Sequence, residues 1–174
     1  MSILERDGLV KRTSVKEKLG RPKVIYSLSE KAEGLFPKAY SDFFKWTIKD
    51  MIEREGPERV RSLMERLGTQ QASYYRERVR EDGDVESLVE ILNELGAFAE
   101  MKRENGHILI REYNCLIYDI AMEFGDLVCE FDLKFISSLL NSNVALKSCI
   151  AHGDRCCSFA LDLQSEFDST EEDE

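Results

Sequence analysis

The sequence of 174 residues predicts a mixed α+β fold with a basic N-terminal hairpin, a helical middle and a C-terminal α+β unit that contains the cysteines. Three observations lead to this prediction: short strand-like runs beside Gly and Pro, apolar residues at helical spacing, and cysteines confined to the C-terminal part. The hydrophobic share of 43% is sufficient for a sizeable core. We therefore divide the chain into segments 1–37, 38–96 and 97–165, followed by an acidic tail, 166–174, that we expect to be disordered.

Two short strand-like runs, 9–13 and 23–28, flank a charged stretch that closes with Gly20-Arg21-Pro22. This pattern is typical of a β-hairpin with a long tip. Ser29 can cap a following helix, because its hydroxyl can accept a hydrogen bond from a free backbone N–H. Pro37 then breaks the chain. The N-terminal segment therefore predicts a hairpin followed by a short helix.

The middle of the chain predicts three helices. The first spans 38–54 and is interrupted by Gly56-Pro57, and Pro57 suits the first turn of the second helix. Asp84 can cap the third helix, which Gly96 ends. Their apolar faces are either core of the chain or a pairing surface for a second subunit, since linked helical hairpins alone have little to bury against. The sequence leaves both interpretations open, and we expect a homodimer.

The C-terminal segment predicts a hairpin, two helices and a second hairpin. Asn105-Gly106 is a strong hairpin signal, and Gly153-Asp154 marks the second turn. The expected elements are strands at 97–101 and 107–113, helices at 115–123 and 127–140, and strands at 143–151 and 157–163. This order defines a compact α+β unit.

Charge is distributed unevenly along the chain. Residues 1–24 contain seven Lys or Arg and three Asp or Glu, a net charge of +4, whereas residues 112–174 have a net charge of −11. The basic end could bind DNA phosphate, because each contact between Lys or Arg and phosphate releases counterions. The alternative is a solvated basic loop. The candidate DNA-contacting residues are Lys11, Arg12, Lys16, Lys18, Arg21 and Lys23.

Several classes of protein are not expected from this sequence. No run approaches the roughly 18 apolar residues of a membrane-spanning helix. Glu5 and Arg6 bring charge too early for a signal peptide, so we expect a cytoplasmic protein. We also find no Ser/His/Asp or Cys/His arrangement and no phosphate-binding glycine loop, so we do not expect an enzyme. A reducing compartment favours metal-binding thiolates over disulfides.

Four spaced cysteines are the candidate metal ligands: Cys115, Cys129, Cys149 and Cys157. Thirteen, nineteen and seven residues separate them, and none of the first 114 residues is Cys. We expect the first two at helix starts, where free N–H groups favour thiolate, and the last two on paired strands. Four thiolates suit an iron–sulfur cluster or zinc.

Two observations limit the metal interpretation. The spacing lacks the paired Cys-x-x-Cys of structural zinc sites, and Cys is also a small residue that is readily buried in a core. Cys156 directly precedes Cys157. Because neighbouring side chains on a strand face opposite sides, we expect only Cys157 to enter a shared site.

Several short motifs together resemble one known family, the winged-helix repressors of iron–sulfur-cluster assembly genes of the Suf-operon regulator type. The motifs are Gly8-Leu9-Val10, Gly20-Arg21-Pro22, Tyr26-Ser27-Leu28-Ser29, Leu35-Phe36-Pro37, Leu95-Gly96-Ala97, Asn114-Cys115, Cys149-Ile150-Ala151-His152-Gly153-Asp154, Cys157 and Phe159. The resemblance implies a partial winged helix with its wing hairpin, a helical dimerisation region and a cysteine-containing sensor domain.

The family's function is implied only as an expectation. The resemblance implies a homodimeric transcriptional regulator that binds a 4Fe–4S rather than a 2Fe–2S cluster through the four cysteines, with zinc as the alternative. Cluster occupancy would then control affinity for operator DNA. A winged helix also needs a helix–turn–helix before its wing, and Met1 to Asp7 supplies only the last turns of its recognition helix. We therefore also consider a dimeric module that binds metal or a small ligand without binding DNA by itself.

Overall fold

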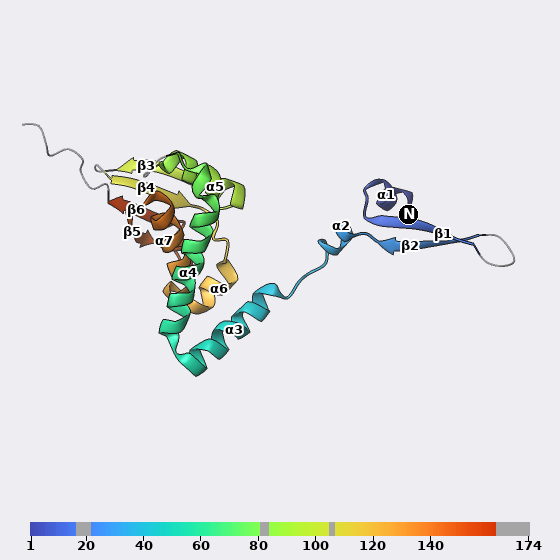
Figure 1. Cartoon of the computed structure of the whole chain (residues 1–174), viewed down its shortest axis with the longest axis horizontal. Coiled ribbons are helices and arrows are strands. Elements are labelled where there is room, and N and C mark those ends of the chain that lie inside the picture. The colour runs from blue at the N-terminus through green and yellow to red at the C-terminus, as the bar shows by residue number, and fades with distance from the viewer. Residues whose placement is uncertain (17–21, 81–83, 105–106, 163–174) are drawn as a thin grey trace, which may run out of the picture. The chain divides into compact units, whose positions relative to one another are not determined.

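The computed structural model describes residues 1–16, 22–80, 84–104 and 107–162. The chain divides into two compact units, Met1–Tyr40 and Ser41–Glu174, which are described separately (Figure 1). Both contain helices and antiparallel strands, which confirms the predicted α+β class. None of the helices in the described ranges is long and apolar enough to cross a membrane.

The first unit is the predicted hairpin between two short helices. Its elements are α1 (Ser2–Arg6), β1 (Val10–Val15), β2 (Lys23–Leu28) and α2 (Glu30–Glu33). The strands pair antiparallel with Val10 opposite Leu28. Ser29 caps α2 as predicted, since its hydroxyl oxygen accepts from the Ala32 amide at 3.2 Å while the hydroxyl donates to the Gly8 carbonyl at 2.7 Å.

The first unit contains little core of its own. Among its described residues, only Val10, Ser29 and Ala32 are buried, and every residue of β2 is exposed. A two-stranded hairpin is marginally stable alone in water. Its exposed apolar side chains, such as Tyr26 and Leu28, therefore contribute little to the stability of this unit.

The second unit contains five α-helices and one four-stranded sheet among its described residues. The elements are α3 (Tyr40–Glu55), α4 (Pro57–Tyr75), α5 (Val85–Leu95), β3 (Ala99–Glu104), β4 (His107–Glu112), α6 (Tyr118–Phe124), α7 (Asp126–Leu140), β5 (Asn143–Ser148) and β6 (Cys157–Asp162). As predicted, Asp84 caps α5 by accepting from the Ser87 amide at 3.0 Å, and Gly96 ends that helix with a φ of 96°.

The two predicted C-terminal hairpins join into a single sheet. The strand order is β3-β4-β6-β5, and every neighbouring pair is antiparallel. The joining pair is β4 and β6, in which Ile110 lies opposite Phe159 and Glu112 opposite Cys157. Along β4 every second residue is buried, because alternate side chains face the core. The sequence indicated the hairpins but not this long-range pairing.

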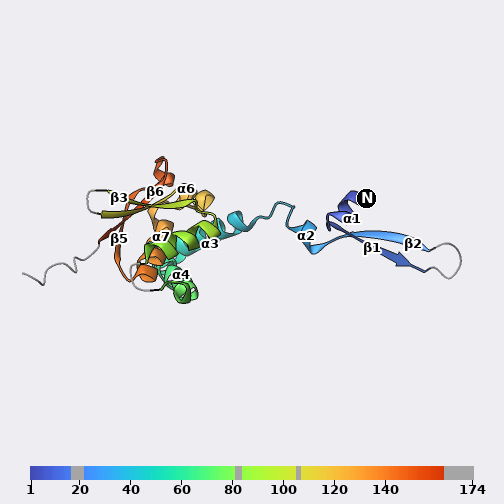
Figure 2. The same ribbon diagram turned by 90° about the horizontal axis from the view of Figure 1, so that it is seen from above.

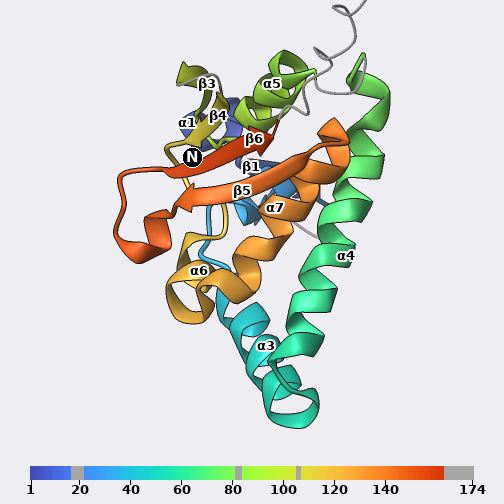
Figure 3. The ribbon, with the colours of Figure 1, turned by 90° about the vertical axis from the view of Figure 1, so that its left-hand side faces the viewer.

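Helix α7 lies between the sheet and α4 (Figure 2). Figure 3 shows α4 and α7 side by side along much of their length. Their backbones approach closely at Gly68, where an added Cβ would lie 2.5 Å from the Phe131 carbonyl oxygen. The buried face of α4, with Val60, Met64 and Ala72, is thus covered within the chain. This stripe is core rather than a pairing surface.

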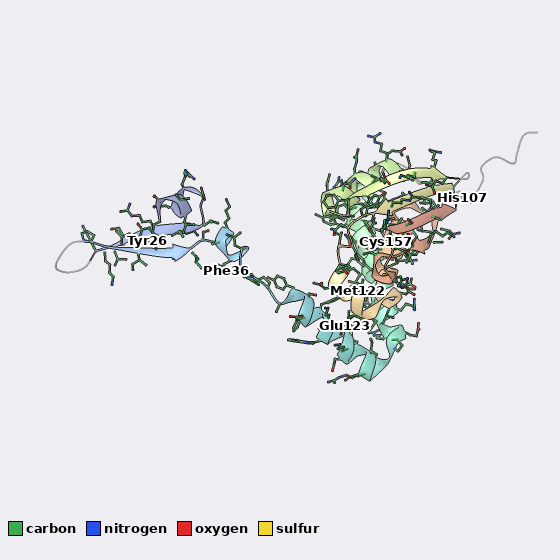
Figure 4. The ribbon with its side chains drawn as sticks, turned by 180° about the vertical axis from the view of Figure 1, so that it is seen from behind. Tyr26, Phe36, His107, Met122, Glu123 and Cys157 are labelled. Carbon is green, nitrogen blue, oxygen red and sulfur yellow. The ribbon has the colours of Figure 1, made fainter. Side chains whose placement is uncertain are left out.

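Helix α3 contacts α6 through Glu123, whose carboxylate pairs with Lys45 at 3.6 Å and with Lys49 (Figure 4). One side of α3 packs through Ile48, whereas Trp46 is exposed. Helix α3 therefore combines a packed face with an exposed aromatic side chain.

Candidate metal centre

The four candidate cysteines lie where one end of the sheet meets the start of α7. Cys129 is in the first turn of α7, as predicted, and Cys157 begins β6 (Figure 4). Cys115 lies in a turn three residues before α6 rather than at a helix start. Cys149 follows β5 and leads into a short 3-10 helix, η2 (Ile150–His152), so it is not within a strand.

Two of these sulfur atoms already lie close together. Cys129 and Cys149 are buried, and their Sγ atoms are 3.9 Å apart. With metal–sulfur bonds of about 2.3 Å, two thiolates of one tetrahedral zinc ion are about 3.8 Å apart. Cys157 lies nearby, because its Sγ accepts a hydrogen bond at 3.4 Å from the amide of Ile150, the residue after Cys149.

The four cysteines affect one another's protonation, because neighbouring thiols contribute to the raised pKa values of Cys115, Cys129 and Cys157. Burial first, and then the neighbouring Cys149, raises the pKa of Cys129. Burial also raises the pKa of Cys157 to about 12, with added repulsion from Cys149 and Cys115. The pKa of Cys115 is raised mainly by burial. A cation at this place would reverse the repulsion, because a nearby positive charge favours the thiolate form.

Two carboxyl groups that the sequence analysis did not single out lie beside the thiols. Glu112, opposite Cys157 in the sheet, is only 5% exposed, and its Oε1 is buried without a hydrogen-bond partner among the described residues. Burial, and then repulsion from Asp132, raises the pKa of Glu112. Burial likewise raises the pKa of Asp132, which lies three residues after Cys129 on α7. Burial thus favours the neutral form of both carboxyls.

The side chains match a thiolate metal site in kind, but their present orientations do not complete one. Within the described ranges, no group of three His, Cys, Asp or Glu side chains is arranged to hold a metal ion. The sulfur atoms of Cys129 and Cys149 have the spacing of two ligands. Binding would require the other side chains to turn toward that pair from their packed, neutral positions.

Cys156 is separate from this group. Its Sγ contacts the Ser158 hydroxyl at 3.5 Å. Cys156 directly precedes β6 and is half-buried, whereas Cys157 is buried at the first position of that strand. That only Cys157 of the two adjacent cysteines enters a shared site stays a prediction.

A pocket of about 470 Å³ lies beside Cys129 and Cys149. Acidic groups occur along its wall: Glu130 pairs with Arg61, and Asp126 pairs with His152 at 3.0 Å. The lining residues are Arg61, Asp126, Cys129, Glu130, Leu133, Leu146, Lys147, Ser148, Cys149, His152 and Asp154. Cys129 and Cys149 thus border a pocket whose wall also has charged and polar side chains.

The candidate DNA-contacting residues belong to the first unit. Lys11, Arg12, Lys16 and Lys23 are exposed on or beside the hairpin, whereas Lys18 and Arg21 lie outside the described residues. Lys11 and Lys23 share one face of the hairpin, and Arg12 projects from the other. The described basic side chains thus do not form a single row.

No protein-family model matches the sequence, and no curated protein shows a significant match. The fold is similar to the phenol-responsive sensory domain of the transcription activator PoxR, solved with phenol, at 15% identity and a TM-score of 0.51. This likeness covers 73% of this chain and 77% of that domain, and it shows a shared fold. Trafficking protein particle complex subunit 3 from Naegleria fowleri, covalently bound to palmitic acid, is less similar at 15% identity and a TM-score of 0.46, over 74% and 98% of the two chains.

Proposed function

We propose that this chain is a sensor of a transcriptional regulator and that it detects a thiolate-bound metal through Cys115, Cys129, Cys149 and Cys157. The observation that supports this most strongly is the 3.9 Å separation of the Cys129 and Cys149 sulfur atoms. The group is an iron–sulfur cluster or zinc, both of which soft sulfur ligands favour. The fold shared with a sensory domain of a transcription activator supports the regulatory part of the proposal.

The proposed signal is a change in the relative positions of the segments that contain the cysteines. Cys129 is on α7, Cys149 follows β5, and Cys115 precedes α6. When bound, the metal supplies positive charge that keeps the thiols deprotonated. Drawing the cysteines to one point would then tie these three segments together, and a two-state shift of this kind could change a homodimer's affinity for operator DNA.

Purification without oxygen, followed by iron, sulfide and zinc analysis and a visible spectrum, tests the metal proposal. We expect metal bound in a fixed ratio to protein, with colour and sulfide if the group is a cluster and neither if it is zinc. A protein that contains no metal and takes up neither Zn²⁺ nor a reconstituted cluster would show that the proposal is wrong.

Zn²⁺ affinity is expected to rise with pH. The raised pKa values of Cys129 and Cys157 mean that both thiols hold protons at neutral pH, and metal must displace those protons. The apparent affinity should therefore increase by up to about tenfold per pH unit for each displaced proton. Competition with a coloured chelator between pH 6.5 and 8.5 measures this, and an affinity independent of pH would contradict displacement of these protons.

The basic hairpin is proposed to contact DNA phosphate. Lys11 and Lys23 are exposed on one of its faces. Replacing both by Ala is expected to weaken binding to duplex DNA of any sequence and to lower the slope of log affinity against log salt by about 0.9 per lost contact. Lys38→Ala is the control, since Lys38 pairs with Glu33 at 3.3 Å in the same unit. Equal DNA binding by the double variant and the wild type would argue for a solvated loop.

A further inference from the structure

The pairing of β4 with β6 places a carboxyl group directly beside one of the candidate ligands. Glu112 and Cys157 are opposite each other, so their side chains lie on the same face of the sheet. This face points into the core, because Ile108 and Ile110 on the same side of β4 are buried. Glu112 also contributes to the raised pKa of Cys115, so its carboxyl lies near two of the four cysteines.

The burial of Glu112 is unusual because nothing among the described residues compensates for it. Glu112 is only 5% exposed, and its Oε1 has no hydrogen-bond partner in the described part of the chain. An unpaired buried carboxylate is unfavourable, so proteins normally pair it, hydrogen-bond it or bind a cation with it.

The surroundings of Glu112 are acidic. Asp132 on α7 is the charged group that acts on Glu112, and no cationic side chain is among the causes that shift the pKa of either. Asp132 also acts on Cys115 and Cys129. Glu112 and Asp132 therefore act on the neighbouring thiols as further acidic groups.

We propose that Glu112 supplies a carboxylate oxygen as one of the four donors to the cation, together with thiolates of the cysteine group, which makes the centre a mixed sulfur–oxygen site. This inference rests on the proposed metal-sensing function. Mixed ligation suits a single borderline divalent ion of the Zn²⁺ and Co²⁺ class, which accepts thiolate and carboxylate together. An all-thiolate cluster would leave the Glu112 carboxylate unused. The inference therefore favours a mononuclear ion over a cluster.

Co²⁺ added to the full metal-free chain tests this inference, because its visible bands report both thiolate ligation and the remaining donors. Wild type is expected to show sulfur-to-cobalt charge-transfer bands. Glu112→Gln should weaken Co²⁺ binding about 10- to 100-fold and shift the ligand-field bands, while the charge-transfer bands per bound ion persist. Glu104→Gln is the matched control, since Glu104 is an exposed residue on the neighbouring strand and pairs with Arg111.

The thermal stability of the metal-free protein provides a second measurement, in which Glu112→Gln should improve on wild type rather than fall below it. Burial raises the pKa of Glu112, so folding at neutral pH must protonate this carboxyl, and that cost destabilises the metal-free protein. Gln does not ionise and avoids this cost, so Glu112→Gln should unfold at a higher temperature than the metal-free wild type but gain less from Co²⁺. A metal-free Glu112→Gln protein that is unfolded or less stable would contradict the inference. Glu112→Asp retains a carboxylate and should keep more Co²⁺ affinity than Glu112→Gln, and the reverse order would also overturn it.

The outcomes separate this inference from the proposed function. Thiolate bands in wild type with an unchanged spectrum and affinity in Glu112→Gln would refute the role of Glu112 and leave the cysteine site intact. A wild-type protein that binds Co²⁺ without any thiolate bands would instead refute the cysteine site, and the role of Glu112 with it.

Discussion

Replacing Cys129 or Cys149 by Ser is expected to weaken Zn²⁺ binding by more than about 100-fold. These two sulfur atoms are the pair already at ligand spacing, 3.9 Å apart. Structural zinc sites bind with roughly 10–16 kcal/mol, so each of four ligands contributes about 3 kcal/mol, and 1.4 kcal/mol is a factor of ten. A serine hydroxyl does not ionise near neutral pH and is a poor substitute for a soft thiolate.

Cys156→Ser is the matched control for these variants. Cys156 is next to Cys157 in sequence but contacts Ser158, so its replacement should leave Zn²⁺ affinity and the Zn²⁺-dependent rise in Tm unchanged. Chelator competition gives the affinity, and thermal unfolding with and without Zn²⁺ gives the stabilisation. Wild-type affinity in both Cys129→Ser and Cys149→Ser, or loss of binding in Cys156→Ser, would assign the site to other residues.

The sequence predicted those parts of the fold that depend on local signals. The caps at Ser29 and Asp84 are hydrogen bonds within three residues, so a short pattern is enough to find them. Pro57 likewise starts α4 as expected. The pairing of β4 with β6 joins segments about 45 residues apart in sequence, and no turn signal connects them. Only the complete core determines that these strands meet.

The candidate site was predictable to a similar extent. The confinement of the cysteines to one α+β unit indicated that they could lie near one another, as Cys129 and Cys149 do. The position of Cys115 was wrong because α6 begins later, after Ile117, which provides no side-chain cap. Glu112 could have been found from the alternation along its strand, since it follows Ile108 and Ile110 at intervals of two. The alternation indicates that the carboxyl of Glu112 points into the core. It does not indicate that Cys157 lies beside it, because that depends on the pairing of β4 with β6.

Gly68→Ala is expected to destabilise the second unit by roughly 3 kcal/mol, and so to lower Tm by roughly 10 °C. In most helix interiors this change instead adds up to about 1 kcal/mol of stability, because Ala is the better helix former. At Gly68 the new Cβ would lie 2.5 Å from the Phe131 carbonyl oxygen and 2.9 Å from the Phe135 amide nitrogen. Both are backbone atoms of α7, which can give way only if the whole helix moves.

The matched control is Gln70→Ala, which alters an exposed residue two positions further along α4 and should change stability by only a few tenths of a kcal/mol. Thermal unfolding of both variants measures the difference, and a Tm for Gly68→Ala equal to or above that of wild type would show that α4 and α7 do not pack this closely.

The Gly68→Ala change should also affect the metal centre. Because α7 includes Cys129, moving this helix away from α4 alters the spacing between the Cys129 and Cys149 sulfur atoms, so Gly68→Ala should weaken Zn²⁺ binding without altering any candidate ligand.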